Sequence, residues 1–189
     1  IKNFILISSD KAVEPTTFMG KTKRVCELLC MKYAEKANDD QKYTTVRFGN
    51  VAGSSGSVIP IFLENIKNNK NLIVKNSETT RYFMSSSEAA YLVTMGAGIN
   101  SNNGDILYLE MGKSYNIYNL AKKMLRMFPY SKSKIILSNL EKNEKLDEKL
   151  LYDFESIIET EEPKIFLVRS DKKLSMKKFD SKYAVLLDL

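Results

Sequence analysis

The feature that most constrains the fold is a continuous apolar run inside residues 3–9, which ends in polar residues just before a helix begins. The run does not alternate with polar residues, as is typical of parallel strands covered on both faces, and it predicts a buried strand. Pro15 and the two threonines after it mark a helix start, and we expect that helix to run to about Ala37. Because ligands bind at the carboxyl ends of strands in open parallel sheets, we expect Asp10 and Lys11 to face a ligand.

Strand and helix signals continue to alternate along the chain. They predict one doubly wound, Rossmann-like α/β parallel sheet over residues 1–169, followed by a basic tail over residues 170–189. The Gly/Ser loop at 49–57 allows close backbone approach to a ligand, although such a loop can also serve flexibility alone. Further strands are expected at 43–48, 72–74, 105–110, 133–137 and 164–168. Further helices are expected at 89–99, after Asn116 and at 146–154.

Composition excludes several classes of function. Hydrophobic residues make up 43% and charged residues 28% of the 189 residues, which is typical of a soluble globular domain. No apolar run approaches the roughly 18 residues of a membrane span. The net charge of +6 raises the question of nucleic acid, but the lysines are scattered and do not interleave with aromatic residues, so no nucleic-acid partner is expected. The positive charge instead favours an anionic ligand.

Two cysteines, Cys26 and Cys30, lie four residues apart on the first predicted helix. The sequence has no histidine and no further cysteine to complete a zinc site, so we expect two buried thiols in a protein of the reducing cytoplasm. The start at Ile1 reads neither as a signal peptide nor as an initiator methionine, and we expect the chain to open inside a longer protein. An uncovered strand edge would then favour association, either as a homo-oligomer or with an N-terminal half.

Three motifs carry a resemblance to a known family. They read SSDKAVEPTTFMGKTKR, VRFGNVAGSSGSVIPIF and TTRYFM. Together they resemble the bacterial polysaccharide-biosynthesis nucleotide-sugar 4,6-dehydratases, which are extended short-chain dehydrogenase/reductase enzymes acting on UDP-N-acetylglucosamine. The resemblance runs from Ile1 to about Arg169. It covers the latter half of such an enzyme, with the catalytic segment and the sugar-nucleotide-binding subdomain.

The resemblance implies NAD, rather than NADP, as the cofactor and a UDP-sugar as the substrate. In the family, hydride leaves C4 of the sugar for NAD, water is eliminated across C5 and C6, and hydride returns to C6. No G-x-G-x-x-G follows any predicted strand, so the fingerprint that holds a dinucleotide's pyrophosphate is absent from the sequence. Hydride transfer is therefore expected to need a dinucleotide-binding half that lies upstream or is encoded separately.

The catalytic roles follow from the resemblance. Asp10 would protonate the departing hydroxyl, Lys11 would take the C5 proton, and Ser9 would hydrogen-bond the sugar; the plain alternative is a solvated strand end. Lys23 matches the lysine of the Tyr-x-x-x-Lys pair and is expected to hold the nicotinamide ribose. Met19 occupies the tyrosine position, as is usual in this branch, and its thioether has no proton to give.

Asn50 and Arg81 match residues that approach the substrate's diphosphate, with a turn residue and a surface ion-pair partner as the plain alternatives. Relatives carry Arg-Pro-Gly-Glu-Lys where this chain has Glu141-Lys142-Asn143-Glu144-Lys145. Glu144 persists and is expected at the substrate, whereas Glu141 exchanges attraction of a diphosphate for repulsion. Either Lys142 compensates, the substrate differs, or the chain is losing its function.

Three functions compete. The leading hypothesis is a UDP-N-acetylglucosamine-type 4,6-dehydratase that lacks its NAD-binding half. A degenerate, non-catalytic remnant that binds a nucleotide-sugar or a protein partner is the alternative that Glu141 and the missing fingerprint favour. A UDP-sugar 4-epimerase is disfavoured, because Met19 removes the tyrosine on which an epimerase relies.

Overall fold

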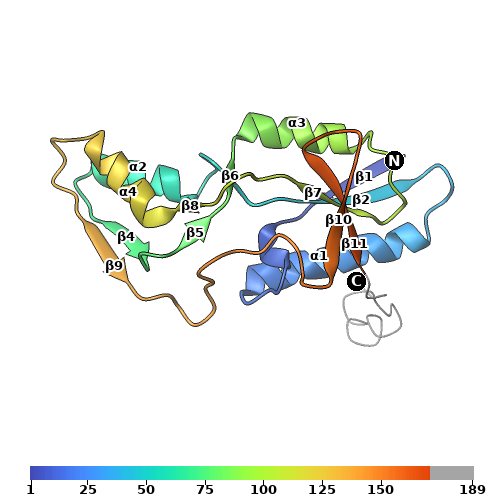
Figure 1. Cartoon of the computed structure of the whole chain (residues 1–189), viewed down its shortest axis with the longest axis horizontal. Helices are drawn as coiled ribbons and strands as arrows, with labels where there is room; N and C mark the ends of the chain where they lie inside the picture. The colour runs from blue at the N-terminus through green and yellow to red at the C-terminus, as the bar shows by residue number, and fades with distance from the viewer. Residues whose placement is uncertain (171–189) are drawn as a thin grey trace.

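A computed structural model describes residues 1–170, so the predicted tail lies outside the described residues except for Ser170. The chain forms two lobes that lie side by side along the long axis (Figure 1). The larger lobe is built on a five-stranded sheet and the smaller one on a parallel pair of strands.

The sheet of the large lobe has the strand order β1-β2-β7-β11-β10. Its strands are β1 (Asn3–Ile7), β2 (Lys42–Arg47), β7 (Ile106–Leu109), β10 (Glu155–Glu159) and β11 (Ile165–Ser170). The first three run parallel, as the sequence predicts. The predicted burial of β1 is wrong: its residues are exposed or half-buried, because β1 is an edge strand in the described part of the chain. β10 and β11 form an antiparallel hairpin, which joins the sheet because β11 also pairs antiparallel with β7. The sequence analysis missed β10. The doubly wound fold is therefore confirmed, with an antiparallel margin on one side.

Two helices cover opposite faces of this sheet, α1 (Phe18–Glu35) and α3 (Ser86–Gly96) (Figure 1). α1 begins later than Pro15, because the hydroxyl of Thr17 accepts a hydrogen bond from the backbone N–H of Gly20 and caps the helix there. The predicted cap of α3 is confirmed: the Ser85 hydroxyl accepts from the backbone N–H of Glu88. In both helices, the cap residue in the sequence marks where the helix starts.

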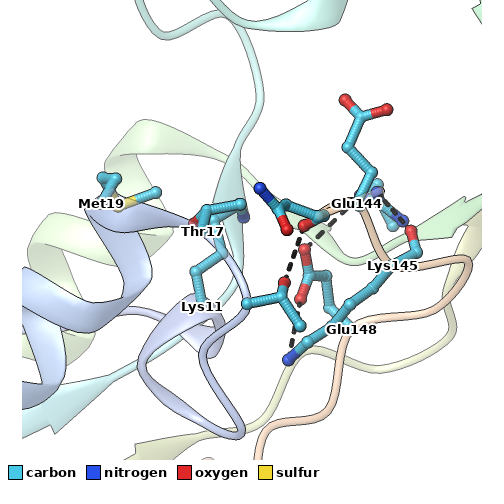
Figure 2. Close-up of a pocket in the computed structure, with 9 residues that line it drawn as sticks. Lys11, Thr17, Met19, Glu144, Lys145 and Glu148 are labelled. Atoms are coloured by element: carbon cyan, nitrogen blue, oxygen red, sulfur yellow. Dashed lines mark hydrogen bonds and ion pairs between the residues drawn. The ribbon is translucent and has the colours of Figure 1, made fainter. Parts of the chain in front are cut away.

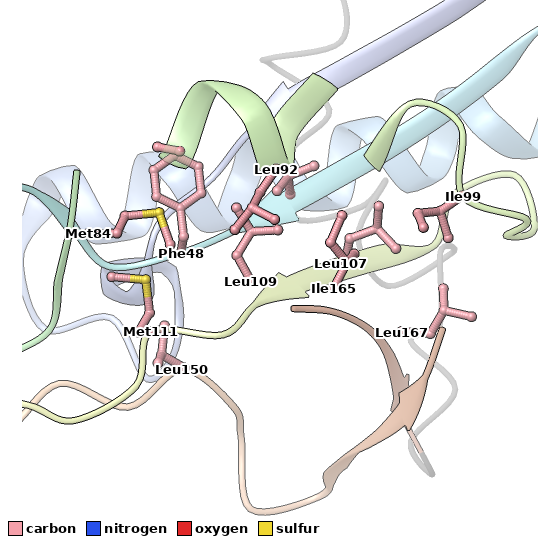
Figure 3. Close-up of a cluster of buried hydrophobic side chains, with 12 residues drawn as sticks. Phe48, Met84, Leu92, Ile99, Leu107, Leu109, Met111, Leu150, Ile165 and Leu167 are labelled. Carbon is pink, nitrogen blue, oxygen red and sulfur yellow. The ribbon is translucent and has the colours of Figure 1, made fainter. Parts of the chain in front are cut away.

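The core of the large lobe lies between the sheet and α3 (Figure 3). Val46, Leu107 and Leu109 are fully buried at its centre. Phe48, Met84 and Met111 extend it toward the carboxyl ends of the parallel strands. These side chains form a rigid base beneath the residues that follow β1 and β2.

The small lobe packs two helices against one face of a strand pair. Its elements are β4 (Leu72–Lys75), β9 (Ile135–Ser138), α2 (Val58–Lys67) and α4 (Ile117–Arg126). Alternate residues of β4 point inward, with Leu72 and Val74 buried among Phe62 and Ala121, while Ile73 and Lys75 face outward. Two short strand pairs join the lobes: β3 (Asn50–Val51) with β6 (Phe83–Met84), and β5 (Thr80–Arg81) with β8 (Tyr115–Asn116).

The predicted helix at 146–154 is wrong, because the segment consists of bends, a turn and irregular backbone. Its carbonyl groups are taken by other parts of the chain. The Leu146 carbonyl accepts hydrogen bonds from the backbone N–H of Thr80 (3.2 Å) and from Arg81 (2.8 Å), and the Lys145 carbonyl accepts from Arg81 (2.9 Å). A helix would need these carbonyls for its own ladder.

A buried cluster of charges connects α1, β2 and β10. Arg47 donates to both carboxylate oxygens of Glu27 (3.1 Å each) and to Glu155 (2.8 Å), and the side chains of Arg47 and Glu27 are 0% exposed. Burial opposes ionisation of Glu27, but the charge and hydrogen bonds of Arg47, with a hydrogen bond from Ser8, lower the pKa of its carboxyl below the ordinary value. The cluster fixes the middle of α1 relative to the sheet.

Of the two cysteines, Cys30 is buried, as expected, and Cys26 is half-buried; both are free thiols. Residues 1–170 contain no group of three or more metal-ligating side chains that could hold a metal ion. Within the same residues, every helix is too short or too polar to cross a bilayer.

Candidate functional site

The end of β1 presents a lysine whose amino group is held by two other side chains. Lys11 lies in the 3₁₀ turn η1 (Asp10–Ala12), and its Nζ donates to Asp10 Oδ1 (2.9 Å) and to Asn50 Oδ1 (3.0 Å). Ser9 caps the turn and donates from its hydroxyl to Asp10 Oδ1 (2.8 Å). The backbone N–H of Asp10 bonds the Phe48 carbonyl, so the ends of β1 and β2 are joined directly beneath the lysine.

Asp10 is fully buried, whereas the Lys11 side chain is 25% exposed. The second carboxylate oxygen of Asp10, Oδ2, has no hydrogen-bond partner among the described residues. Gly49 passes directly over it: a Cβ at that position would lie 3.3 Å from Oδ2 and 3.1 Å from the Tyr82 Cβ. Only a glycine fits there comfortably, so the backbone closes over Asp10 and leaves Lys11 as the exposed member of the pair.

Asn50 owes its orientation to the β3–β6 pair. Its backbone N–H donates to the Tyr82 carbonyl (3.1 Å), and its side-chain Nδ2 donates to the same oxygen (3.2 Å). The amide nitrogen is thereby directed at Tyr82 and the amide oxygen at Lys11. The structure therefore brings Lys11 and Asn50 together from segments 39 residues apart.

Two adjoining cavities open beside this cluster. One, of about 260 Å³, is lined by Lys11 and Met19 together with the segment that follows Leu140; we call it the Lys11 cavity (Figure 2). The other, of about 520 Å³, lies between Asn50, the start of α2 and the end of β4; we call it the Lys75 cavity. Arg81 and Glu144 line both. A ligand with two chemically different halves could occupy the pair.

Lys23 lies apart from this group. Its Nζ donates to the Ile7 carbonyl at the end of β1 (3.1 Å), and it is not among the residues that line either cavity. β1 is an edge strand of the sheet in the described part of the chain. Lys23 thus marks the open side of the sheet, whereas Met19, on the same helix, lines the Lys11 cavity.

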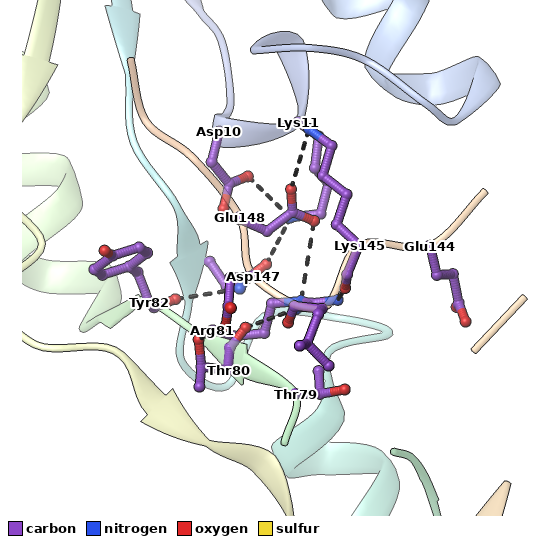
Figure 4. Close-up of polar contacts among 12 residues, drawn as sticks. Asp10, Lys11, Thr79, Thr80, Arg81, Tyr82, Glu144, Lys145, Asp147 and Glu148 are labelled. Carbon is purple, nitrogen blue, oxygen red and sulfur yellow. Dashed lines mark hydrogen bonds and ion pairs between the residues drawn. The ribbon is translucent and has the colours of Figure 1, made fainter. Parts of the chain in front are cut away.

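The guanidinium of Arg81 hydrogen-bonds backbone carbonyls instead of pointing into solvent. Its guanidinium donates to the carbonyls of Thr80 (2.6 Å), Leu146 (2.8 Å) and Lys145 (2.9 Å) (Figure 4). These bonds hold the 145–146 segment against β5. The expected contact with a diphosphate remains a prediction, and in this structure the side chain shapes the wall that the two cavities share.

Lys75 is a cation of the site that the sequence analysis missed. Its Nζ donates to Glu141 (2.8 Å) and to Glu144 (2.6 Å), and these hydrogen bonds raise the pKa of Lys75. Burial opposes ionisation of Glu144, but the Lys75 bond and one from the backbone N–H of Glu141 lower the pKa of its carboxyl. The cation that meets Glu141 is thus Lys75, 66 residues away in the sequence, rather than the neighbouring Lys142. The glutamate at position 141, where relatives carry arginine, was the available sequence signal for a cation in another segment of the chain.

Glu148 is the second residue missed. It lies in the wrongly predicted helix, lines the Lys11 cavity, and has a side chain that is only 7% exposed. Its neighbours of opposite charge, Arg81 and Lys145, stand at 4.0 Å and 3.9 Å. No sequence pattern marks a glutamate for burial in a charged cavity, because the tertiary structure alone puts it there.

Comparison with known proteins agrees with this architecture. The chain is 40% identical over 153 residues to the capsular polysaccharide biosynthesis protein CapD of Staphylococcus aureus, a match that covers 80% of this chain and 25% of CapD. It is 34% identical over 163 residues to a UDP-glucose 4-epimerase of Rickettsia bellii (strain OSU 85-389), covering 86% of this chain and 45% of the epimerase. The model of the family described as "Polysaccharide biosynthesis protein" matches residues 1–170.

The chain belongs to the polysaccharide-biosynthesis protein family. Among solved structures, the polysaccharide-biosynthesis fold seen here superposes on Pen from Bacillus thuringiensis with a TM-score of 0.80 and 28% identity, covering all of this chain and 63% of that one. The predicted resemblance and the extended short-chain dehydrogenase/reductase fold are confirmed. This polysaccharide-biosynthesis protein spans less than two thirds of the length of each relative: 25% of CapD, 45% of the epimerase and 63% of Pen.

Proposed function

We propose that the chain is the catalytic and sugar-nucleotide-binding part of an NAD-dependent 4,6-dehydratase of the UDP-N-acetylglucosamine type, acting in the cytoplasm in surface-polysaccharide biosynthesis. The observation that carries this proposal is the amino group of Lys11, which faces a cavity while buried Asp10 and oriented Asn50 hold it at 2.9 and 3.0 Å. The family and its fold make a nucleotide-sugar the natural substrate.

Elimination of water needs a base near C5 and an acid near O6 of the hexose. Transfer of one proton along the 2.9 Å hydrogen bond from Lys11 to Asp10 would give a neutral amine and a carboxylic acid. The amine then accepts the C5 proton. Because Asp10 is buried, the acid would give its proton to the departing hydroxyl through the Ser9 hydroxyl that is bonded to it, which restores the ion pair. When bound, NAD supplies the hydride acceptor for C4 and the donor for C6.

Met19 favours a dehydratase over an epimerase. A thioether has no proton to exchange with a sugar hydroxyl, so the cavity wall offers no acid or base at that position. The C4 proton would leave through water or through the Asp10–Lys11 pair. The similarity to UDP-glucose 4-epimerases then reflects shared ancestry of the fold rather than shared chemistry.

The acidic residue at position 141 is compatible with an anionic ligand, because Glu141 is paired with Lys75 and does not itself line the cavity. We propose that Lys75 provides the positive charge on the nucleotide side, with Asn50 beside it and Arg81 fixing the wall. The remnant hypothesis keeps one argument, the missing dinucleotide fingerprint.

For NAD, this chain offers Lys23 of α1, whose amino group lies at the end of the edge strand β1. A ribose hydroxyl could accept a hydrogen bond from that amino group. The pyrophosphate would have to be held by a different segment. We propose that a dinucleotide-binding unit pairs with the free edge of β1, whose Phe4 and Ile7 side chains are both exposed. A second copy of this chain on the same edge would instead give a homo-oligomer.

The test is to incubate the protein with UDP-N-acetylglucosamine and NAD, with and without a dinucleotide-binding unit, and to analyse the nucleotides by mass spectrometry. We expect a 4-keto-6-deoxy product, lighter than the substrate by one water, when both parts are present. Lys11→Ala should abolish that product and leave nucleotide-sugar binding nearly unchanged. Tight binding without product would support the remnant hypothesis, and turnover by Lys11→Ala would exclude Lys11 as the base.

A further inference from the structure

Glu148 is a buried carboxylate that faces a cavity. Its side chain is 7% exposed and comes from the turn-rich segment that lines the Lys11 cavity (Figures 2 and 4). Its Oε2 is buried and has no hydrogen-bond partner in the described part of the chain. Buried carboxylates are normally satisfied by donors, so this oxygen requires an explanation.

The surrounding cations do not supply the missing donor. Lys145 Nζ donates to the Val13 carbonyl at 2.7 Å and stands 3.9 Å from Glu148, which is attraction without a hydrogen bond. Arg81 directs its terminal nitrogens at backbone carbonyls, and its Nε is 4.0 Å from the carboxylate. The two cations therefore stabilise the charge on Glu148 and leave Oε2 without a hydrogen-bond donor.

We infer that Glu148 is a positioning residue that accepts a hydrogen bond from the hexose of the substrate, through a hydroxyl or the acetamido N–H. This inference rests on the proposed function, because it takes the Lys11 cavity as the place of the sugar. A carboxylate repels phosphate and attracts neutral donors, so it selects the sugar half of a nucleotide-sugar. Lys11 lines the same cavity, so the hexose held by Glu148 lies next to the amine that would take its proton.

The Lys75 cavity accommodates the other half of the ligand. It has the larger volume, about 520 Å³, apolar walls from α2 and β4, and the Lys75 amino group. A nucleobase needs such apolar surface, and a diphosphate would take the Lys75 amino group in exchange for one of its two carboxylate partners. The shared wall of Arg81 and Glu144 then separates the nucleotide from the hexose, which gives the two cavities different ligand preferences.

Isothermal titration calorimetry with UDP and with UDP-N-acetylglucosamine tests the inference. Glu148→Gln should weaken UDP-N-acetylglucosamine binding about tenfold, the value of one charge-assisted hydrogen bond, while UDP affinity changes by less than about twofold. Asp153→Asn, an exposed carboxylate further along the same segment, is the matched control and should alter neither affinity. Thermal melting of each variant checks that the fold is intact.

The outcomes separate this inference from the function on which it rests. Equal weakening of both ligands by Glu148→Gln, or no weakening of either, would overturn the role of Glu148 and leave the proposed function standing. Absence of binding of both ligands to the unaltered protein would overturn the proposed function together with the inference. A loss confined to UDP-N-acetylglucosamine at an unchanged melting temperature supports the sugar contact.

Discussion

Replacing Arg47 by methionine tests whether the buried charge cluster holds the large lobe together. Within residues 1–170, Arg47 makes four hydrogen bonds: two to Glu27, one to Glu155 and one to the Leu150 carbonyl. Methionine fills much of the same volume and makes none of them. Glu27 keeps the guanidinium of Arg24 at 2.7 Å, whereas the charge on Glu155, with a side chain 3% exposed, loses its buried cation.

The expected loss is large for a single substitution. Removing one member of a buried ion pair costs about 3–5 kcal/mol, because the partner charge stays buried without compensation. For a protein of this size, that loss corresponds to a fall in melting temperature of roughly 6–20 °C. Arg169→Met is the matched control: its pair with Asp105 (3.2 Å) is partly exposed and should be worth no more than about 1 kcal/mol.

The effect also has a predicted pH dependence. In the native protein the pKa of Glu27 lies below its ordinary 4.5, so the stability this group contributes is present above that value and is lost as pH falls through the lowered pKa. Without Arg47, burial would raise the pKa of Glu27, and its ionisation near neutral pH would then destabilise the fold. The difference in unfolding free energy between the two proteins should widen from about pH 4 to about pH 7.

Urea denaturation followed by circular dichroism at several pH values measures both effects. The reasoning is refuted if Arg47→Met and Arg169→Met unfold at the same urea concentration, or if the difference between Arg47→Met and the unaltered protein is constant across the pH range. Adding Glu27→Gln and Glu155→Gln to Arg47→Met should recover part of the stability, because neutral amides are less costly to bury than unpaired charges.

Three further outcomes are expected. Gly20→Ala should abolish product formation and lower the melting temperature by several degrees, because its Cβ would lie 2.3 Å from the Lys11 carbonyl oxygen and displace the turn. Cys26 should react with a thiol reagent at least about tenfold faster than Cys30, since Cys30 is buried and burial raises the pKa of its thiol; equal rates measured by mass spectrometry would contradict this. Lys75→Met should weaken UDP binding by calorimetry, more at low salt than at high salt.

Local signals in the sequence were sufficient for much of the fold. The strand β1 and the cap of α3 depend on neighbouring residues, and both are present as predicted. The predicted burial of β1 is wrong, because its residues are exposed or half-buried. The segment 146–154 has helical residues but gives its carbonyls to Arg81 and Arg47, whose positions depend on strands far away in the sequence. A local pattern could not reveal that competition.

The candidate site shows the same contrast between local sequence signals and long-range contacts. The motif around Lys11 identified the residue, and only the fold could add that Asn50 Oδ1 lies 3.0 Å from its amino group. Lys75 was missed because a single outward residue on a short strand carries no signal until Glu141 is known to lie beside it. The roles of Ser9, Asp10 and Lys23 remain predictions.

The chain leaves the large lobe after β2, travels through the small lobe, and returns through β6 and α3 to β7, which lies next to β2 in the sheet (Figure 1). Outgoing β3 and returning β6 are paired at Asn50 and Phe83, and after β7 the chain enters the small lobe a second time through β8, which pairs with β5. Asn50 therefore lies at the junction of the lobes, and Lys11 lies on the large lobe. The 3.0 Å contact between these two side chains would change in length with any movement of one lobe against the other.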